Sequence, residues 1–327
     1  MHRRVFLGLL SGAVAVSPHL SAAQNPAKIF RVGLLSPGPV ITDSSPFGTA
    51  MIRGLAERGY ELGKNLQLER RGADGHLDRL PQLVAELVAS KIDVLATTGY
   101  PTAVAAKKAT SLPIVAVNAG DPVGTGLVNS LSHPDGNLTG ISDVSAEMTP
   151  KRLELLKQMA PTLRRVAVLW NADDLGMTLR YRASETGARA LGISVQPLGV
   201  REPDDFNDAF TAMSRDMPDA ILMVTDSLTL LNRKRVFDFA ATHRLPAIYE
   251  FGFLVKDGGL MSYGPDEGEM YGRWAALVAR VLGGAKPADL PFEEPSKFAL
   301  YINLKTAQGI GLTVPPLLLA QADEVVE

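Results

Sequence analysis

The sequence predicts an α/β protein made of two doubly wound, parallel-sheet lobes joined by a hinge. Short apolar runs alternate with helical patterns over residues 28–282, and strands separated by helices form parallel sheets through right-handed crossovers. About ten strands are expected, which is more than one twisted sheet comfortably holds. A stretch rich in Gly, Pro, Asp and Ser at 132–145 lies near the middle of the 327 residues, so the chain is long enough and suitably divided for two lobes.

The first half of the chain predicts four strands and three helices. The strands are expected at 31–36, 66–70, 93–97 and 114–118, and the helices at 46–59, 80–88 and 102–109. The helix at 80–88 has the clearest pattern, because its apolar residues recur at intervals of three and four and so share one face. The stretch 132–145 is interpreted as a last strand of this lobe that leads into a crossover.

The second half repeats the alternation. Strands are expected at 165–170, 194–198, 220–224, 247–249 and 259–263, and helices at 177–190, 204–214, 228–242 and 267–282, with a further helix that Thr149 and Pro150 cap and open. Prolines over 283–295 indicate a later crossing between the lobes.

Composition excludes several classes of function. The net charge is −2 without a basic block, which argues against nucleic acid as a partner because phosphate binding needs clustered Lys and Arg. The chain has no cysteine, so disulfides, thiolate chemistry and Cys-ligated metal are excluded. Its histidines lack metal-ligand spacing, and no phosphate-loop, dinucleotide or nucleophile-elbow motif is complete. We therefore expect no catalytic residues, no metal and no cofactor.

Residues 1–23 have the layout of a secretory signal. Arg3 and Arg4 precede an apolar run, VFLGLLSGAVAV, and small residues ending at Ala23 offer a cleavage site. The double arginine is similar to a twin-arginine signal, but His2 and Gly8 depart from that pattern. Export by the general secretory route or by the twin-arginine route, and an uncleaved membrane anchor, are the alternatives left open.

The candidate binding residues follow the strands, because ligands of open parallel sheets bind beyond the carboxyl ends of the strands. These positions carry small polar groups, glycines and aromatic rings: Ser36, Thr97, Thr98, Gly99, Tyr100, Asn118, Asp121, Asn171, Asp226, Ser227, Glu250 and Phe251. The helix start after Thr98 suits an anion, and Asp121 or Asp226 suits an amine. The alternative is that such residues only cap helices and make turns.

Several stretches together resemble the substrate-binding proteins of ABC transporters related to the tryptophan-binding type. The matching stretches are Gly59-Tyr60, residues 63–66, 78–81, 85–88, 121–124, 134–140, 151–156 and 168–171, and the final run NLKTAQGIGLTVPPLLLAQADEVVE from Asn303. They span essentially the whole chain after the signal. The resemblance implies a type I periplasmic-binding-protein fold, with three crossovers between the lobes and a ligand enclosed by hinge closure.

The resemblance also implies boundaries, a location and a role. The first lobe is expected over 28–143 plus roughly 265–292, and the second over 144–264 plus roughly 296–327. Without a cysteine to lipidate, the protein is expected to be a free periplasmic monomer that captures a small molecule, such as an amino acid or a related aromatic or apolar compound, for an ABC permease. The alternatives are a ligand-sensing partner of a membrane receptor, an exported hydrolase that uses carboxylates, and the effector domain of a regulator.

Overall fold

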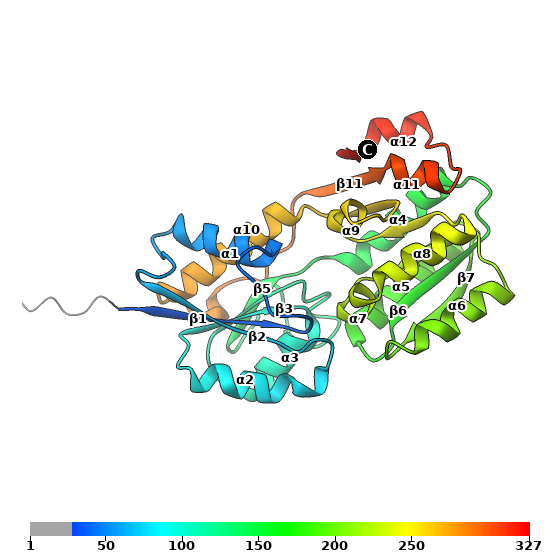
Figure 1. Ribbon diagram of the computed structural model, residues 1–327. Coiled ribbons are helices and arrows are strands. Elements are labelled where there is room, and N and C mark those ends of the chain that lie inside the picture. The colour runs from blue at the N-terminus through cyan, green and yellow to red at the C-terminus, as the bar shows by residue number, and fades with distance from the viewer. Residues whose placement is uncertain (1–27) are drawn as a thin grey trace, which may run out of the picture.

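The computed structural model describes residues 28–327, which form two α/β lobes side by side (Figure 1). The first lobe is built on a five-stranded sheet of order β2-β1-β3-β4-β5, and the second on a seven-stranded sheet of order β12-β11-β10-β9-β8-β6-β7. Adjacent strands are parallel, except that β11 runs antiparallel to β10. The predicted fold class, two mainly parallel α/β sheets, is confirmed.

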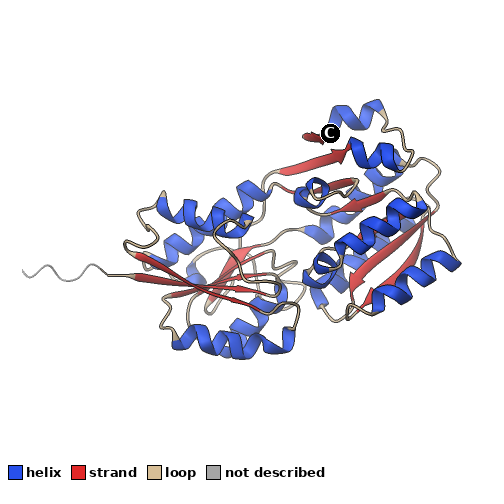
Figure 2. Ribbon diagram, in the orientation of Figure 1, coloured by secondary structure: helices blue, strands red, loops and turns tan. Residues whose placement is uncertain are grey.

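The first lobe takes its elements from both ends of the chain. They are β1 (Phe30–Ser36), α1 (Pro46–Ala56), β2 (Leu66–Gly72), α2 (Leu80–Ala89), β3 (Val94–Thr98), α3 (Tyr100–Ala109), β4 (Ile114–Val117), β5 (Leu138–Ile141) and α10 (Glu267–Leu282), with short 3₁₀ turns at Leu77–Arg79 and Pro287–Asp289. Helices α1 and α10 cover one face of the sheet, and α2 and α3 cover the other, as Figure 2 shows.

Helices cover both faces of the first sheet, so its inner strands β3 and β4 are buried along their whole length rather than on alternate residues. Val94 and Ala96 of β3 face the core under α1 and α10, while Leu95 between them faces the core under α2 and α3. Trp274 of α10 is fully buried, and its Nε1 donates a hydrogen bond to the Val115 carbonyl of β4 at 3.0 Å. Helix α10 is therefore an integral part of the first core, although it follows the second lobe in sequence.

The second lobe contains the rest of the described chain. Its strands are β6 (Arg165–Asn171), β7 (Ser194–Val200), β8 (Ala220–Met223), β9 (Ala247–Tyr249), β10 (Met261–Pro265), β11 (Phe298–Asn303) and β12 (Glu324–Val326). Its helices are α4 (Ser145–Met159), α5 (Leu175–Ala190), α6 (Asp205–Arg215), α7 (Ser227–Leu231), α8 (Arg233–His243), α9 (Gly252–Lys256), α11 (Leu304–Gly309) and α12 (Pro316–Gln321). Alternate residues of β6 again face two different cores.

The chain crosses between the lobes three times, and the three crossing segments are hydrogen-bonded to one another. The first follows β5, and its Ser142 N–H donates to the Glu293 carbonyl at 2.9 Å. Glu293 belongs to another crossing, and its own N–H donates to the Gly140 carbonyl at 2.8 Å. The remaining crossing follows β10, and its Asp266 N–H donates to the carbonyl of Lys297, which lies in the same crossing as Glu293, at 2.9 Å. These short, paired segments form the hinge.

Three sequence-based boundaries are corrected. Helix α4 begins at Ser145 rather than at Thr149, and Pro150 lies inside it, because the start is set by the Asp143 carboxylate, which accepts from the Ser145 N–H at 3.1 Å. The single helix predicted at 228–242 is two helices that meet at Asn232. Strands β11 and β12 had not been predicted, since their pairing with β10 depends on a return of the chain from the first lobe.

No helix within residues 28–327 combines the length and the apolar character that a membrane crossing requires. The predicted signal at 1–23 lies outside the described residues.

Two glycines test how tightly α10 packs in the first core. A Cβ at Gly54 of α1 would lie 2.5 Å from the Ala275 Cβ of α10, whereas a Cβ at Gly272 would meet nothing within 4 Å. Both Gly→Ala changes gain helix propensity, worth about 1 kcal/mol, but Gly54→Ala also forces the two helices apart, at about 1–3 kcal/mol. We expect urea unfolding to show a lower stability for Gly54→Ala and an unchanged or higher one for Gly272→Ala; equal effects would contradict this packing.

Candidate functional site

A cavity of about 930 Å³ lies between the lobes, at the carboxyl ends of the parallel strands. Nine of the twelve candidate binding residues line it: Ser36, Thr98, Gly99, Tyr100, Asn118, Asn171, Asp226, Ser227 and Phe251. They come from loops after β1, β3 and β4 of the first lobe and β6, β8 and β9 of the second. These loops meet because the carboxyl ends of neighbouring parallel strands lie on one edge of a sheet.

Three of the twelve candidates do not line the cavity. Thr97 is fully buried within β3. Asp121 makes a local turn, in which its Oδ1 accepts from the N–H groups of Val123 and Gly124 at 3.1 and 2.8 Å. Glu250 lies behind the cavity wall, where it pairs with two buried arginines. The capping interpretation therefore describes Asp121.

Asp226 lines the cavity and also caps a helix. Its Oδ1 accepts from the Thr229 N–H at 2.9 Å in a capping box that begins α7. Its Oδ2 accepts from the Asn171 Nδ2 at 2.6 Å. These bonds orient the carboxylate at the cavity wall.

The two lobes touch across the cleft. A Cβ on Gly176 of α5 would lie 3.6 Å from the Tyr100 Cβ of the first lobe. A Cβ on Gly75 of the first lobe would lie 3.2 Å from the Leu231 Cδ1 of α7. Residues of the two lobes therefore lie close together on opposite sides of the cleft.

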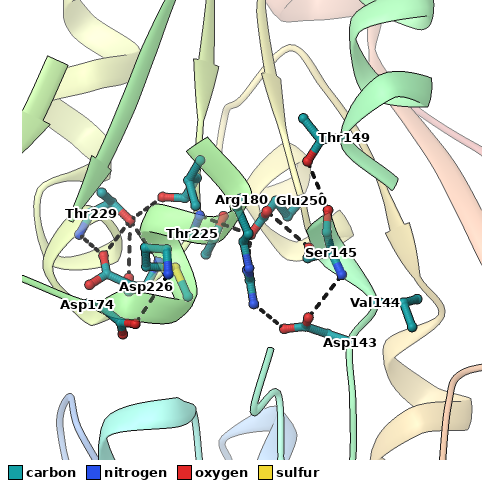
Figure 3. A network of polar contacts seen from close by, with 12 residues as sticks. Asp143, Val144, Ser145, Thr149, Asp174, Arg180, Thr225, Asp226, Thr229 and Glu250 are labelled. Carbon is teal, nitrogen blue, oxygen red and sulfur yellow. Dashed lines mark hydrogen bonds and ion pairs between the residues drawn. The ribbon is translucent and has the colours of Figure 1, made fainter. Parts of the chain in front are cut away.

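A buried network joins two arginines, Arg152 and Arg180, to two carboxylates, Asp143 and Glu250. Figure 3 shows Arg180 with both carboxylates. Arg180 of α5 donates from Nη1 to Glu250 at 2.7 Å and from Nη2 to Asp143 at 2.5 Å. Arg152 of α4 donates from Nη1 to Glu250 at 3.3 Å. All four residues are at most 2% exposed, so each charge depends on its partners rather than on water.

The same network holds the start of α4 and the end of β8. The Arg152 Nη2 donates to the Ser145 Oγ at 2.9 Å, and that hydroxyl donates to the Glu250 Oε1 at 3.0 Å. The Thr225 N–H donates to the Glu250 Oε2 at 3.0 Å. Burial opposes protonation of Arg180, yet the charges of Asp143 and Glu250 raise the pKa of its guanidinium. Arg180 is thus a fixed cation.

A second pair of acids, Asp174 and Asp226, stands at the second-lobe wall beside this network, as Figure 3 shows. Asp174 begins α5 and accepts from the Gly176 and Met177 N–H groups at 2.7 and 3.2 Å. Burial raises the pKa of Asp174 to about 6, and the negative charge of Asp226 adds to the shift. Burial also raises the pKa of Asp226. The buried part of this wall therefore has four carboxylates and two guanidinium groups. Arg201 and Arg233 also line the cavity, but they pair with Asp173 and Asp257.

The first-lobe wall has the opposite character. Helix α3 begins at Tyr100 after Gly99, whose φ of 81° suits glycine, and no side chain caps its N-terminal N–H groups. These N–H groups and the helix dipole favour an anion. The cleft therefore places an acidic wall opposite a helix N-terminus.

Among the cavity residues that sequence reasoning missed are Asp143, Asp174, Arg180, Glu267 and Tyr271. Asp174 directly follows a strand-end loop that had been singled out, and its position before a helix was a usable signal. Arg180, Glu267 and Tyr271 lie within helices, where only the packing of distant elements turns them toward the cleft. Within residues 28–327, no group of three or more His, Asp or Glu side chains could hold a metal ion.

Two mainly parallel α/β lobes, a three-segment hinge and an interlobe cavity define a ligand-binding clamp. Residues 48–326 match the family of ABC transporter substrate binding proteins, and the chain belongs to that family. It is the solute-binding component of an ABC transporter, in a family that acts outside the cytoplasmic membrane and binds rather than converts its ligand. The expected resemblance is confirmed.

Three known proteins are similar to this chain over most of its length. A tyrosine-binding protein of Clostridioides difficile is 26% identical over 262 residues, which are 80% of this chain and 75% of that protein. An ABC domain from Streptococcus pneumonia, solved in complex with L-Trp, has a TM-score of 0.84 at 25% identity and covers 91% of this chain and 100% of its own. A conserved domain protein from Vibrio cholerae has a TM-score of 0.85 at 27% identity with the same coverage. The two solved structures share the fold of this chain.

The buried network predicts a large cost for removing one of its charges. Glu250→Gln leaves Arg152 and Arg180 incompletely paired in a dry site, so we expect the free energy of unfolding in urea to fall by about 3–5 kcal/mol. The matched control is Glu154→Gln, which breaks the exposed pair with Lys151 at 3.5 Å and is expected to cost less than about 1 kcal/mol. Similar losses for the two variants would contradict the role of the network.

The acid pair predicts a pH-dependent gain of stability in Asp174→Asn. Because burial raises the Asp174 pKa to about 6 from the ordinary 3.8, ionisation of this group opposes folding as the pH rises between these values. Asparagine stays neutral and still caps α5. We expect the ligand-free variant to match the native stability near pH 4 and to exceed it by about 1–3 kcal/mol above pH 7.

Thermal unfolding across this pH range checks the prediction. Asp173→Asn is the control, since this exposed neighbour pairs with Arg201 at 3.2 Å and should show no such gain. A gain in Asp174→Asn that does not vary with pH would count against the assignment.

Proposed function

We propose that this protein captures a zwitterionic amino acid with an aromatic side chain in the interlobe cleft and delivers it to an ABC permease. The observation that carries the proposal is the excess of negative charge at the second-lobe wall. The buried cluster there holds four carboxylates and two guanidinium groups, and the other arginines that line the cavity, Arg201 and Arg233, are paired with Asp173 and Asp257. A ligand ammonium group between Asp174 and Asp226 would supply the missing positive charge.

The opposite end of the ligand would meet the first lobe. The N-terminal N–H groups of α3 and the hydroxyl of Thr98 suit a carboxylate, which also favours the positive end of the helix dipole. A ligand that spans the two walls stabilises the closed form because it contacts both lobes only when they meet. We assign the lobes to 28–143 with 265–292 and to 144–264 with 296–327.

Two further features support an aromatic amino acid. Phe47, Phe251, Phe253 and Tyr271 line one part of the cavity and offer ring faces for an apolar or aromatic group. Relatives about 25% identical to this chain are a tyrosine-binding protein and a protein solved with L-Trp. The export signal at 1–23, the periplasmic location and the monomeric state remain part of the proposal, and a receptor in place of the permease is the alternative partner.

Calorimetric titration with L-tyrosine, tyramine and 3-(4-hydroxyphenyl)propanoate tests the zwitterion directly. The two analogues keep the ring and lack the carboxylate or the ammonium group, so we expect each to bind about 10–100-fold more weakly than L-tyrosine. Asp226→Asn keeps the capping geometry and should reduce the affinity for L-tyrosine by a similar factor. The control Asp173→Asn should leave that affinity unchanged. Equal affinity for 3-(4-hydroxyphenyl)propanoate and L-tyrosine would overturn the ammonium site.

A further inference from the structure

An acidic side chain lies within the aromatic part of the cavity. Four rings from separate segments line this part: Phe47 of α1, Phe251 and Phe253 around the start of α9, and Tyr271 of α10. The centroids of Phe47 and Tyr271 are 4.5 Å apart, and the near-parallel rings of Phe251 and Phe253 are 6.0 Å apart. Glu267, one turn before Tyr271 on α10, lines the cavity among them.

The Glu267 carboxylate is only partly satisfied by its surroundings. Its Oε2 accepts from the Phe253 N–H at 3.3 Å, and its Oε1 accepts from the Tyr271 hydroxyl at 3.5 Å, at the limit of a hydrogen bond. No cation of residues 28–327 lies within 4 Å of it, because the nearby Lys256 pairs with Glu324 at 2.9 Å. Burial raises the pKa of Glu267 to about 7.

Asn118 adds a second acceptor at the same place. Its backbone is left-handed, with φ at 55°, as β4 ends. Burial raises the pKa of Tyr271 and the Asn118 side chain lowers it, so the amide lies beside the Tyr271 hydroxyl. The Asn118 Oδ1 is buried and has no hydrogen-bond partner in the described part of the chain. A buried acceptor without a donor costs free energy that a ligand can recover.

We propose that Glu267, together with Asn118, accepts a hydrogen bond from a donor on the ligand's ring, so that the site selects a phenol or an indole over an unsubstituted phenyl ring. The inference rests on the proposed function and adds a specificity determinant to it. An apolar wall alone would bind phenylalanine about as well as tyrosine. A wall with unpaired hydrogen-bond acceptors disfavours a ring that lacks a donor. When such a ring binds, the acceptors lose contact with water and gain no hydrogen bond in return.

The test compares L-tyrosine with L-phenylalanine, which share the zwitterion and differ by one hydroxyl. Calorimetry on the full mature chain should give an affinity for L-tyrosine at least about 10-fold higher than for L-phenylalanine. The affinity for L-tryptophan should likewise exceed that for L-phenylalanine. Glu267→Met keeps the length of the side chain without an acceptor. We expect it to reduce the tyrosine-to-phenylalanine ratio to about 1–3 through loss of tyrosine affinity alone, and Glu267→Gln, which retains one acceptor oxygen, to give an intermediate ratio.

Glu202→Gln is the matched control, because it removes one carboxylate from the exposed rim of the same cavity and should leave the ratio unchanged. Equal affinities of the native protein for the two amino acids would overturn the inference and leave the zwitterion site intact. So would an equal loss of both ligands in Glu267→Met, which would assign Glu267 to the ammonium group. If the folded native protein binds neither amino acid, the proposed function fails, and this inference fails with it.

Discussion

The buried pairing of Arg152 and Arg180 with Asp143 and Glu250 is the interaction on which the site depends. It joins the first crossing segment to the start of α4, the end of β8 and the middle of α5. Buried ion pairs contribute little net stability compared with an apolar core, but an incomplete one is very costly. The network therefore acts mainly by permitting one arrangement of these segments. Because the same segments form parts of the hinge and of the cavity wall, it also fixes the geometry of both.

The same network explains the electrostatics of the cleft. Arg180 lines the cavity, yet two carboxylates already hold its terminal nitrogens, so it offers little attraction to a ligand anion. Asp174 and Asp226 line the same cavity, and their neighbours in residues 28–327 hold them by hydrogen bonds from N–H groups rather than by ion pairs. Negative charge on one wall and a helix N-terminus on the other therefore make the two walls of the cleft electrostatically different.

Chain direction and hydrophobic pattern made much of this structure predictable. Loops after parallel strands share one edge of a sheet, so residues such as Thr98, Asn171 and Asp226 could be grouped without any knowledge of side-chain contacts. Glu250 fitted the same rule, but its carboxylate is turned away by two arginines whose burial no local pattern indicates. Glu267 could not be found either, because α10 joins the first lobe after an excursion through the whole second lobe. Strand β11 depends on the same long return.

That return has a consequence for how the chain acquires its structure. Trp274 and its neighbours on α10 fill the centre of the core that β1, β3 and β4 begin, so the first lobe lacks a large part of its interior until residue 282 is available. Contacts this distant in sequence form late and slowly. During synthesis the N-terminal lobe therefore stays open and loosely packed until nearly the whole second lobe has been made.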